Sequence, residues 1–170
     1  MTMEFRKARL EDAAGIARVC SEGWRVTYAE IESEQVISET IREFYNVEQI
    51  QKEVLEISHY WNGYFVAHDG EQVVGAGGGG FNSEGEAELY VLYLDPTRKR
   101  EGLGTRLLEA ITKDQVERGG TEQWVSVTKG NEMGIPFYEA VGFEYQHEVP
   151  AFGRPEDSGA MSLRYKRKIG

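Results

Sequence analysis

The stretch from Leu92 to Thr105 has the residue types and order of a phosphate-binding loop. An apolar run ends at Asp95-Pro96, a basic turn follows, and Gly102-Leu103-Gly104 comes next, which predicts a strand, a turn and the start of a helix. The first N–H groups of a helix have no acceptor within it, and the positive end of the helix dipole adds to them. Because glycines also let the main chain approach phosphate oxygens closely, we expect a pyrophosphate here.

Three kinds of phosphate loop can be compared with this stretch. A Walker loop needs Gly-x-x-x-x-Gly-Lys-Ser/Thr, and the sequence contains no such string. A Rossmann fingerprint needs a third glycine where Leu107 stands. The third kind is the acyl-CoA loop of the GNAT N-acetyltransferases. Asp95-Pro96 followed by Lys99 to Gly104 resembles that loop, with Lys99 where an arginine or glutamine is usual.

A second stretch, Asn131 to Phe143, resembles the other GNAT signature, Asn-x-x-Ala-x-x-Phe-Tyr-x-x-x-Gly-Phe. Gly134 replaces the common alanine. A predicted helix and strand separate the two signatures, as in the family. The resemblance covers at least residues 88–143, and the N-terminal part of the chain fits the family layout more loosely.

The resemblance implies an α/β (α+β) fold, with a mixed, mostly antiparallel central sheet flanked by helices, as one domain over residues 1–170. It implies acetyl-CoA as co-substrate, a primary amine as acceptor and direct transfer between them. No metal is expected, because His59, His68 and His147 lack metal-ligand spacing. Since family members are often dimers, a homodimer is possible.

The resemblance also implies roles by position. The amides of Arg100 to Thr105 would hold the pyrophosphate, and Arg98, Lys99 or Arg100 would reach its oxygens. The main chain of Leu92 and Leu94 would pair with the pantetheine arm as an added pseudo-strand. The full cofactor-binding set is Leu92, Tyr93, Leu94, Lys99, Arg100, Glu101, Gly102, Leu103, Gly104, Thr105 and Asn131.

Two further groups are needed for chemistry. An amine is protonated at neutral pH, so a base must remove a proton before attack. Glu88 matches the position of a glutamate base in some family members. A water chain, Glu86 or Tyr90 is the alternative, and Glu88 would then be a structural carboxylate. Tyr138 stands where the family places a phenol that protonates the leaving thiolate, and otherwise packs beside the cofactor.

The acceptor is less readable than the donor. The region from Trp24 to Ile57 loosely resembles bacterial family members that act on polyamines, and the net charge of −10 favours a cationic partner over nucleic acid. Trp24, Tyr28 and Trp61 would line the acceptor pocket or pack in the core. The alternatives are a protein N-terminus or lysine as acceptor, and a non-catalytic acyl-CoA sensor.

The composition describes a folded protein that binds no membrane. The chain has 170 residues, of which 40% are hydrophobic, and a single cysteine, Cys20, which we assign to the core. The sequence contains no membrane span or signal peptide. We therefore expect a cytoplasmic protein.

The elements that must position these residues divide the chain in two. The first part reads as a strand over residues 3–8 and three helices, the second capped by Ser33 and the third by Asn46. A hairpin is expected over residues 64–77, turning at Asp69-Gly70-Glu71. Gly77 to Gly80 follow and indicate either a flexible arm or an access route for substrate.

The second part begins with a strand over residues 88–94, apolar on both faces and therefore expected to be central and buried. A helix over 104–118 and a strand over 124–128 complete a crossover unit with local parallel pairing. A helix over 131–141 and strands over 143–149 and 161–168 follow. The basic residues of the last strand, 164–168, predict a solvated sheet edge.

Overall fold

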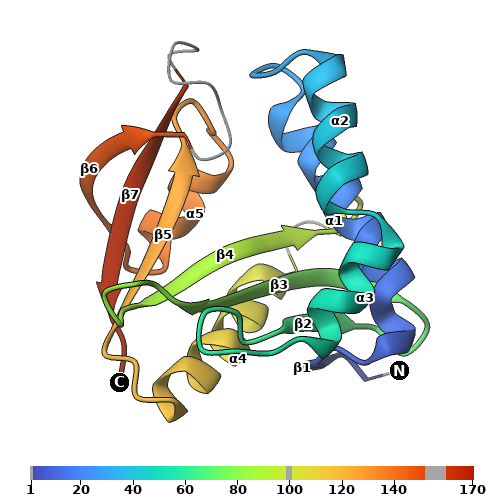
Figure 1. Cartoon of the computed structure of the whole chain (residues 1–170), viewed down its shortest axis with the longest axis horizontal. Coiled ribbons are helices and arrows are strands. Elements are labelled where there is room, and N and C mark those ends of the chain that lie inside the picture. Colours follow the sequence, from blue (N-terminus) through green and yellow to red (C-terminus); the bar gives the residue numbers. More distant parts are fainter. Residues whose placement is uncertain (1, 99–100, 152–159) are drawn as a thin grey trace.

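The computed structural model describes residues 2–98, 101–151 and 160–170 and contains a seven-stranded sheet, in the order β1-β2-β3-β4-β5-β7-β6 (Figure 1). The strands are β1 (Glu4–Lys7), β2 (Tyr64–His68), β3 (Val73–Phe81), β4 (Ala87–Leu94), β5 (Glu122–Thr128), β6 (Glu144–Pro150) and β7 (Met161–Lys168). Every neighbouring pair is antiparallel except β4 and β5, which run parallel. The predicted mixed, mostly antiparallel sheet and the parallel crossover are confirmed.

Five α-helices and one short 3₁₀ turn lie in the described residues, and the predicted caps of two helices can be checked directly. They are a 3₁₀ turn η1 (Leu10–Asp12), α1 (Ala13–Tyr28), α2 (Glu34–Phe44), α3 (Val47–Leu55), α4 (Leu103–Glu117) and α5 (Gly134–Ala140). Ser33 Oγ accepts a hydrogen bond from the N–H of Val36, and Asn46 Oδ1 accepts one from that of Gln49. Both side chains satisfy N–H groups that have no acceptor within the helix, so the two predicted caps are confirmed.

Helices cover both faces of the sheet. On one face, α1 and α3 bury Ile16, Cys20 and Ile50 against β2 and β3, which confirms the core position of Cys20. On the other face, α4 buries Leu107 and Ile111 against β4 and β5, with α5 beside it. Figure 1 shows β5, β6 and β7 turned away from the plane of β1 to β4. The sheet therefore opens between its two central strands.

The opening begins after three residues of pairing. Ala87, Glu88 and Leu89 of β4 pair with residues 123–125 of β5, and the ladder ends there. A β-bulge lies at the same level, because Gly78 pairs with Val91 and Gly79 with Leu89, so that Tyr90 has no partner on β3. A bulge bends its strand and redirects side chains. The C-terminal half of β4 is half-exposed rather than buried as predicted, because it lines the space that this opening creates.

The glycine run from Gly77 to Gly80 lies in the buried strand β3, so the predicted flexible arm is wrong. A Cβ on Gly79 would collide with the carbonyl oxygen of Glu88, and one on Gly80 with that of Tyr60. Trp61, which the sequence offered for the acceptor pocket, packs over Gly78. The glycines thus make room for the bulged neighbour strand and for the crossing segment around Trp61.

The basic strand β7 is interior, which corrects the predicted solvated edge. It pairs with β5 on one side and with β6 on the other. Arg167 is bound by Gln123 and Thr112, and Arg164 by Glu88. Both arginines bury their stems within the sheet; Arg164 pairs its charge with Glu88, and Arg167 donates to neutral acceptors. Alternating basic residues do not reveal this pattern by themselves.

Candidate active site

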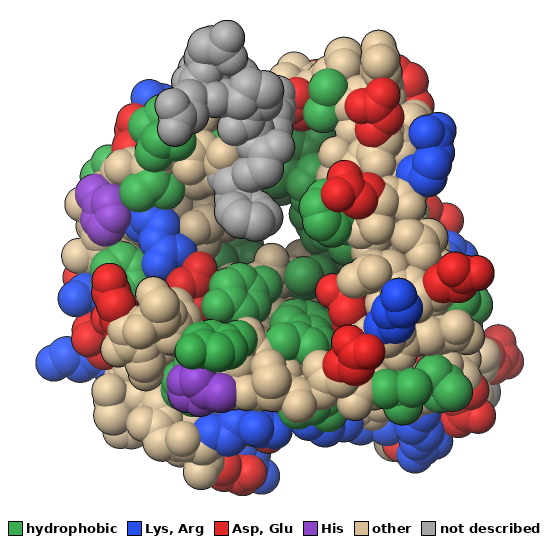
Figure 2. Space-filling model, viewed as in Figure 1, with side chains coloured by type: hydrophobic (Ala, Val, Ile, Leu, Met, Phe, Trp, Pro, Cys, Tyr) green, Lys and Arg blue, Asp and Glu red, His purple; other side chains and the backbone are tan. Residues whose placement is uncertain are grey.

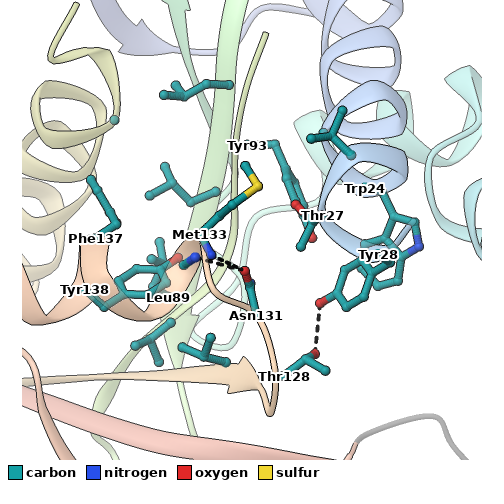
Figure 3. A pocket seen from close by; sticks show the side chains of 18 of the residues that line it. Trp24, Thr27, Tyr28, Leu89, Tyr93, Thr128, Asn131, Met133, Phe137 and Tyr138 are labelled. Atoms are coloured by element: carbon teal, nitrogen blue, oxygen red, sulfur yellow. Dashed lines mark hydrogen bonds between the residues drawn. The ribbon is translucent and has the colours of Figure 1, made fainter. Parts of the chain in front are cut away.

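A cavity of about 610 Å³ occupies the opening between β4 and β5 (Figure 3). Its walls come from α1, the second half of β4, the end of β5, the start of α4 and α5. Predicted site residues that line it are Trp24, Tyr28, Leu92, Tyr93, Leu94, Gly104, Asn131 and Tyr138. Lys99 and Arg100 lie outside the described residues. The fold therefore brings most of the predicted cofactor and acceptor residues to one space.

The β4 wall offers free main-chain groups. The N–H of Asp95 donates to the carbonyl of Val74 on the β3 side at 2.9 Å. Successive main-chain groups of a strand alternate in direction, so those of Leu92 and Leu94 point away from β3. That side is the opening, where pairing with β5 has ended. An extended ligand with amide groups fits this edge as an added strand.

The turn before α4 is built for close approach. Gly102 precedes the helix with φ +72°, a conformation that favours glycine, and a Cβ there would meet no atom of the described residues. The first N–H groups of α4 have no acceptor within the helix, so this end of the helix can bind an anion. These features fit a pyrophosphate.

Arg98 is bound to two carboxylates, although the sequence suggested that it would reach the pyrophosphate oxygens. Its guanidinium donates to Asp69 Oδ2 at 2.9 Å and to both carboxylate oxygens of Glu101, at 2.8 and 3.1 Å. These bonds tie the loop before α4 to the turn between β2 and β3. Arg98 therefore supports the loop, although it also lines the cavity.

Gly104 and Asn131 line the cavity and also take part in the contacts of α4 and α5. A Cβ on Gly104 would lie 3.2 Å from Phe137 and 3.3 Å from Leu94. Asn131 Oδ1 accepts from the N–H of Gly134 at 2.9 Å, which caps α5 and starts it later than predicted. A Cβ on Gly134 would lie 2.7 Å from Asn131 Nδ2, so an alanine here would require the Asn131 side chain to shift.

Tyr138 lies in the cavity wall between two aromatic rings. Phe137 and Phe143 contact it edge-on, at centroid distances of 5.1 and 5.5 Å. Burial raises the pKa of Tyr138, and the nearby Tyr28 phenol raises it further. The phenol therefore stays protonated at neutral pH and remains a hydrogen-bond donor, as an acid at this position requires.

Glu88 is not presented to the cavity. Its carboxylate accepts from Arg164 Nη1 at 2.7 Å and Nη2 at 3.1 Å, and its side chain is 11% exposed. Asn82 Nδ2 lies 3.3 Å from the same group. Glu86, the neighbouring alternative, accepts from the indole N–H of Trp124 at 2.9 Å. The structure thus brings Tyr138 to the cavity and leaves Glu88 in an ion pair, an arrangement that disfavours the predicted base role.

Aromatic side chains form the end of the cavity opposite α4. Trp24 packs on Tyr28 with ring centroids 4.2 Å apart, and Tyr45 and Tyr93 adjoin them. Tyr28 Oη is hydrogen-bonded to Thr128 Oγ1 at 2.9 Å, which connects the end of α1 to the end of β5 across the opening (Figure 3). These side chains present π faces and phenol oxygens, groups that attract cations.

Fixed charge is scarce among the described residues of the lining. Asp95 and Arg98 are the charged side chains there. Burial alone would raise the pKa of Asp95, but hydrogen bonds from Thr97 and Arg18 lower it below its ordinary value. Both charges are thus already paired, and a cationic ligand would meet aromatic and hydroxyl groups instead.

Several lining residues were missed from the sequence. Tyr45, Ser126, Thr128 and Met133 all line the cavity. Met133 is 53% exposed and directly precedes α5. Ser126 and Thr128 alternate on β5 with buried valines, and this alternation is the one signal that could have identified them as facing an opening.

Metal-binding and membrane-spanning features were also searched for. Within residues 2–98, 101–151 and 160–170, no three His, Cys, Asp or Glu side chains are grouped as ligands for a metal ion. None of the helices in those ranges has the length and apolar character to span a bilayer.

Comparison with known proteins gives one consistent family. The model of the acetyltransferase (GNAT) family matches residues 26–143. A spermidine N(1)-acetyltransferase of Thermoplasma acidophilum is 30% identical over 150 residues, which are 86% of this chain and 91% of that protein. The ribosomal protein bS18-alanine N-acetyltransferase of Escherichia coli K12 is 38% identical over 82 residues, covering 46% of this chain and 55% of the relative.

A solved structure matches nearly the whole fold. The crystal structure of a PaiA N-acetyltransferase from Thermoplasma acidophilum in complex with coenzyme A has a TM-score of 0.84 and 27% identity. The match covers 99% of this chain and 100% of that one.

Proposed function

Because this chain belongs to the GNAT family of acetyltransferases, we propose that it transfers the acetyl group of acetyl-CoA to a primary amine of a small polycation such as a polyamine. The acyltransferase activity follows from the family. The acceptor is our proposal, and so are the roles of the individual residues given below.

The open edge of β4 is the observation that carries the donor half of the proposal. Leu92 and Leu94 present their main-chain groups to a cavity that continues to the start of α4. A pantetheine arm along this edge would place its thioester near Tyr90, just beyond the point where β4 stops pairing with β5. The pyrophosphate would then lie at the first N–H groups of α4, and the coenzyme A complex of the similar PaiA structure supports this arrangement.

The reaction that fits this geometry is direct transfer. The amine loses a proton to solvent, its lone pair attacks the thioester carbon, and the carbonyl oxygen becomes an oxyanion. Collapse breaks the carbon–sulfur bond, and the Tyr138 phenol donates a hydrogen bond to the sulfur as the thiolate leaves. The nitrogen, which became positively charged on attack, releases its second proton to solvent, so that the products are the neutral amide and coenzyme A. A main-chain N–H of β4 stabilises the oxyanion, and holding both reactants in one cavity supplies much of the rate.

The acceptor end supports a small cation. Trp24, Tyr28 and Tyr93 offer π faces and phenol oxygens in place of a fixed carboxylate, and the net charge of −10 attracts cations to the protein. The relative of 30% identity is a spermidine acetyltransferase, and it matches over 86% of this chain. Figure 2 shows acidic side chains around the opening on this face.

A protein N-terminus is the second candidate acceptor. It is favoured by the relative that acts on the N-terminal alanine of a ribosomal protein, although that match covers only 46% of this chain. A lysine side chain would present the same amine chemistry. A non-catalytic sensor would bind coenzyme A equally well, and the protonated Tyr138 in the cavity counts against that role.

One experiment separates these functions. The protein and acetyl-CoA are incubated in parallel reactions with one amine each: spermidine, spermine, a peptide beginning with alanine, or a lysine peptide. Thiol release is followed in every reaction. We expect turnover with the polyamines. Turnover confined to a peptide would support the second candidate, and none with any amine, despite thermal stabilisation by coenzyme A, would support the sensor.

A further inference from the structure

A charged cluster lies on the acceptor side of the sheet, outside the reacting groups described above. Arg164 of β7 and Glu88 of β4 form a two-bond ion pair, with side chains only 16% and 11% exposed. The guanidinium also stacks over Trp124, 4.9 Å from the centre of the ring. Arg164 is therefore held by charge on one side and by an aromatic face on the other.

The ion pair is connected to the cavity by a hydrogen bond to the hydroxyl of Ser126. Arg164 Nη1 donates to Ser126 Oγ at 2.8 Å, and Ser126 lines the cavity on the β5 side of the opening. Tyr90 lines the β4 side, and its phenol lies within electrostatic range of both Glu88 and Arg164. One wall of the acceptor end is thus backed by a fixed ion pair that joins β4 to β7.

The carboxylate of Glu88 is engaged with protein groups and does not line the cavity. Both of its oxygens accept from Arg164, and Asn82 donates to one of them. Removal of either partner would leave the other charge largely buried without its counter-charge, which is strongly unfavourable. The same argument means that removing either partner alone does more harm than removing both.

We propose that Glu88 and Arg164 act as one positioning unit, which holds the Ser126 hydroxyl in the acceptor wall of the cavity, and that Glu88 takes no proton from the amine. This inference rests on the proposed function, because it concerns the acceptor of that reaction. It assigns to Arg164 and Ser126 a role in acceptor binding, and to Glu88 a role through Arg164 alone.

The test compares E88Q, R164Q and the double variant, with the amine that the wild type acetylates. We expect R164Q to raise the acceptor KM by about tenfold, because an unpaired buried carboxylate displaces the wall. The double variant should recover the part of that loss that the unpaired carboxylate causes, while the part that comes from the lost contact with Ser126 remains. E88Q should lower kcat by less than about tenfold and retain the acidic limb of the kcat/KM profile, whereas loss of a general base costs about 100-fold or more.

Two further variants test whether the effect on acceptor binding depends on Ser126. S126A should raise the acceptor KM as R164Q does, and combining the two should add little, because both remove one contact. Lys166→Gln is the matched control, since it breaks a 3.3 Å ion pair that joins the same strand β7 to Glu122 of β5, away from the cavity lining. It should leave the KM unchanged. Coenzyme A binding and melting temperature are measured for every variant to confirm folding.

The outcomes separate this proposal from the function. If E88Q abolishes the acidic limb, or if the double variant is worse than R164Q, the positioning unit is wrong while the acetyltransferase reaction stands. If the wild type acetylates no amine, both the proposed acceptor and this inference are overturned.

Discussion

The two ends of the cavity are built from different parts of the chain. The α4 end uses main-chain groups of Leu92, Leu94 and the following turn, which are contiguous in sequence. The aromatic end uses side chains that meet from far apart, such as Tyr28 and Thr128, which are 100 positions from one another. One end therefore depends on backbone shape, and the other on individual side chains.

This difference teaches how the donor and acceptor sites can vary. A main-chain site tolerates most substitutions as long as glycines and strand direction are kept. A side-chain site changes its ligand with a few residues and leaves the fold intact. The relatives fit this view, because a spermidine acetyltransferase and an alanine N-acetyltransferase are both similar to this chain although they are named for different acceptors.

The largest effect is expected at Tyr138, where the two ends meet. Tyr138→Phe removes the phenol and keeps the ring between Phe137 and Phe143. In the proposed mechanism the phenol interacts with the leaving sulfur, so kcat should fall by about 100-fold. Stopped-flow thiol release gives kcat, and calorimetry gives coenzyme A affinity, which should change little. An unchanged rate of the chemical step would remove Tyr138 from the mechanism.

The second-largest effect is expected at the α4 end of the cavity and should leave the aromatic end unaffected. Gly104→Val inserts branched carbon atoms where Phe137 and Leu94 already lie 3.2 and 3.3 Å from a Cβ. The start of α4 must shift, so coenzyme A affinity should fall by about tenfold, at a stability cost of about 1–3 kcal/mol.

Leu108→Ala is the control for lost stability, because Leu108 is buried on the same helix and does not line the cavity. It should lower the melting temperature and leave the coenzyme A Kd unchanged. Retained affinity in Gly104→Val would show that this turn is not the pyrophosphate site.

The contiguous end was the predictable one. A phosphate loop is predicted from one short stretch, Gly102, Leu103 and Gly104, and the strand before it fixes the direction of the main chain. Helix starts were equally local, since the side chains of Ser33 and Asn46 bond to N–H groups only three residues away.

The parts that the sequence did not predict depend on contacts between distant residues. Glu88 reads as a free strand carboxylate until β7 brings Arg164 to it from 76 positions away. The β3 glycines read as a flexible arm because the segment that packs over them, around Trp61, is visible only in the fold. Sheet order decides both cases, and sequence periodicity carries no information on which strands become neighbours.

A smaller effect should be confined to the side-chain end. Tyr28→Phe and Thr128→Val each remove one hydroxyl from the same 2.9 Å hydrogen bond and keep the shape of the residue. A neutral hydrogen bond contributes about 1 kcal/mol, so each variant should raise the acceptor KM about fivefold and leave coenzyme A affinity unchanged. The double variant should resemble either single one. Additive losses, or a change in coenzyme A affinity, would contradict the separation of the two ends.

The smallest effect concerns the support of the main-chain end. Main-chain N–H groups of Gln72 and Glu71 lower the pKa of Asp69 to about 2; burial opposes this, and Arg98 adds to the lowering. A folded-state pKa below the ordinary value means that the carboxylate stabilises the protein above about pH 4 and that this stability is lost as the pH falls toward 2.

Asp69→Asn should therefore lower the melting temperature at pH 7 by about 2 °C, a small shift because the ion pair is partly exposed, and the difference should vanish near pH 2. Because Arg98 holds the loop before α4, coenzyme A affinity should weaken slightly while the acceptor KM stays constant. Asp114→Asn is the matched control, since it breaks an ion pair with Arg118 at the far end of the same helix. A difference in melting temperature that persists unchanged to pH 2 would show that the charge of Asp69 does not support this loop.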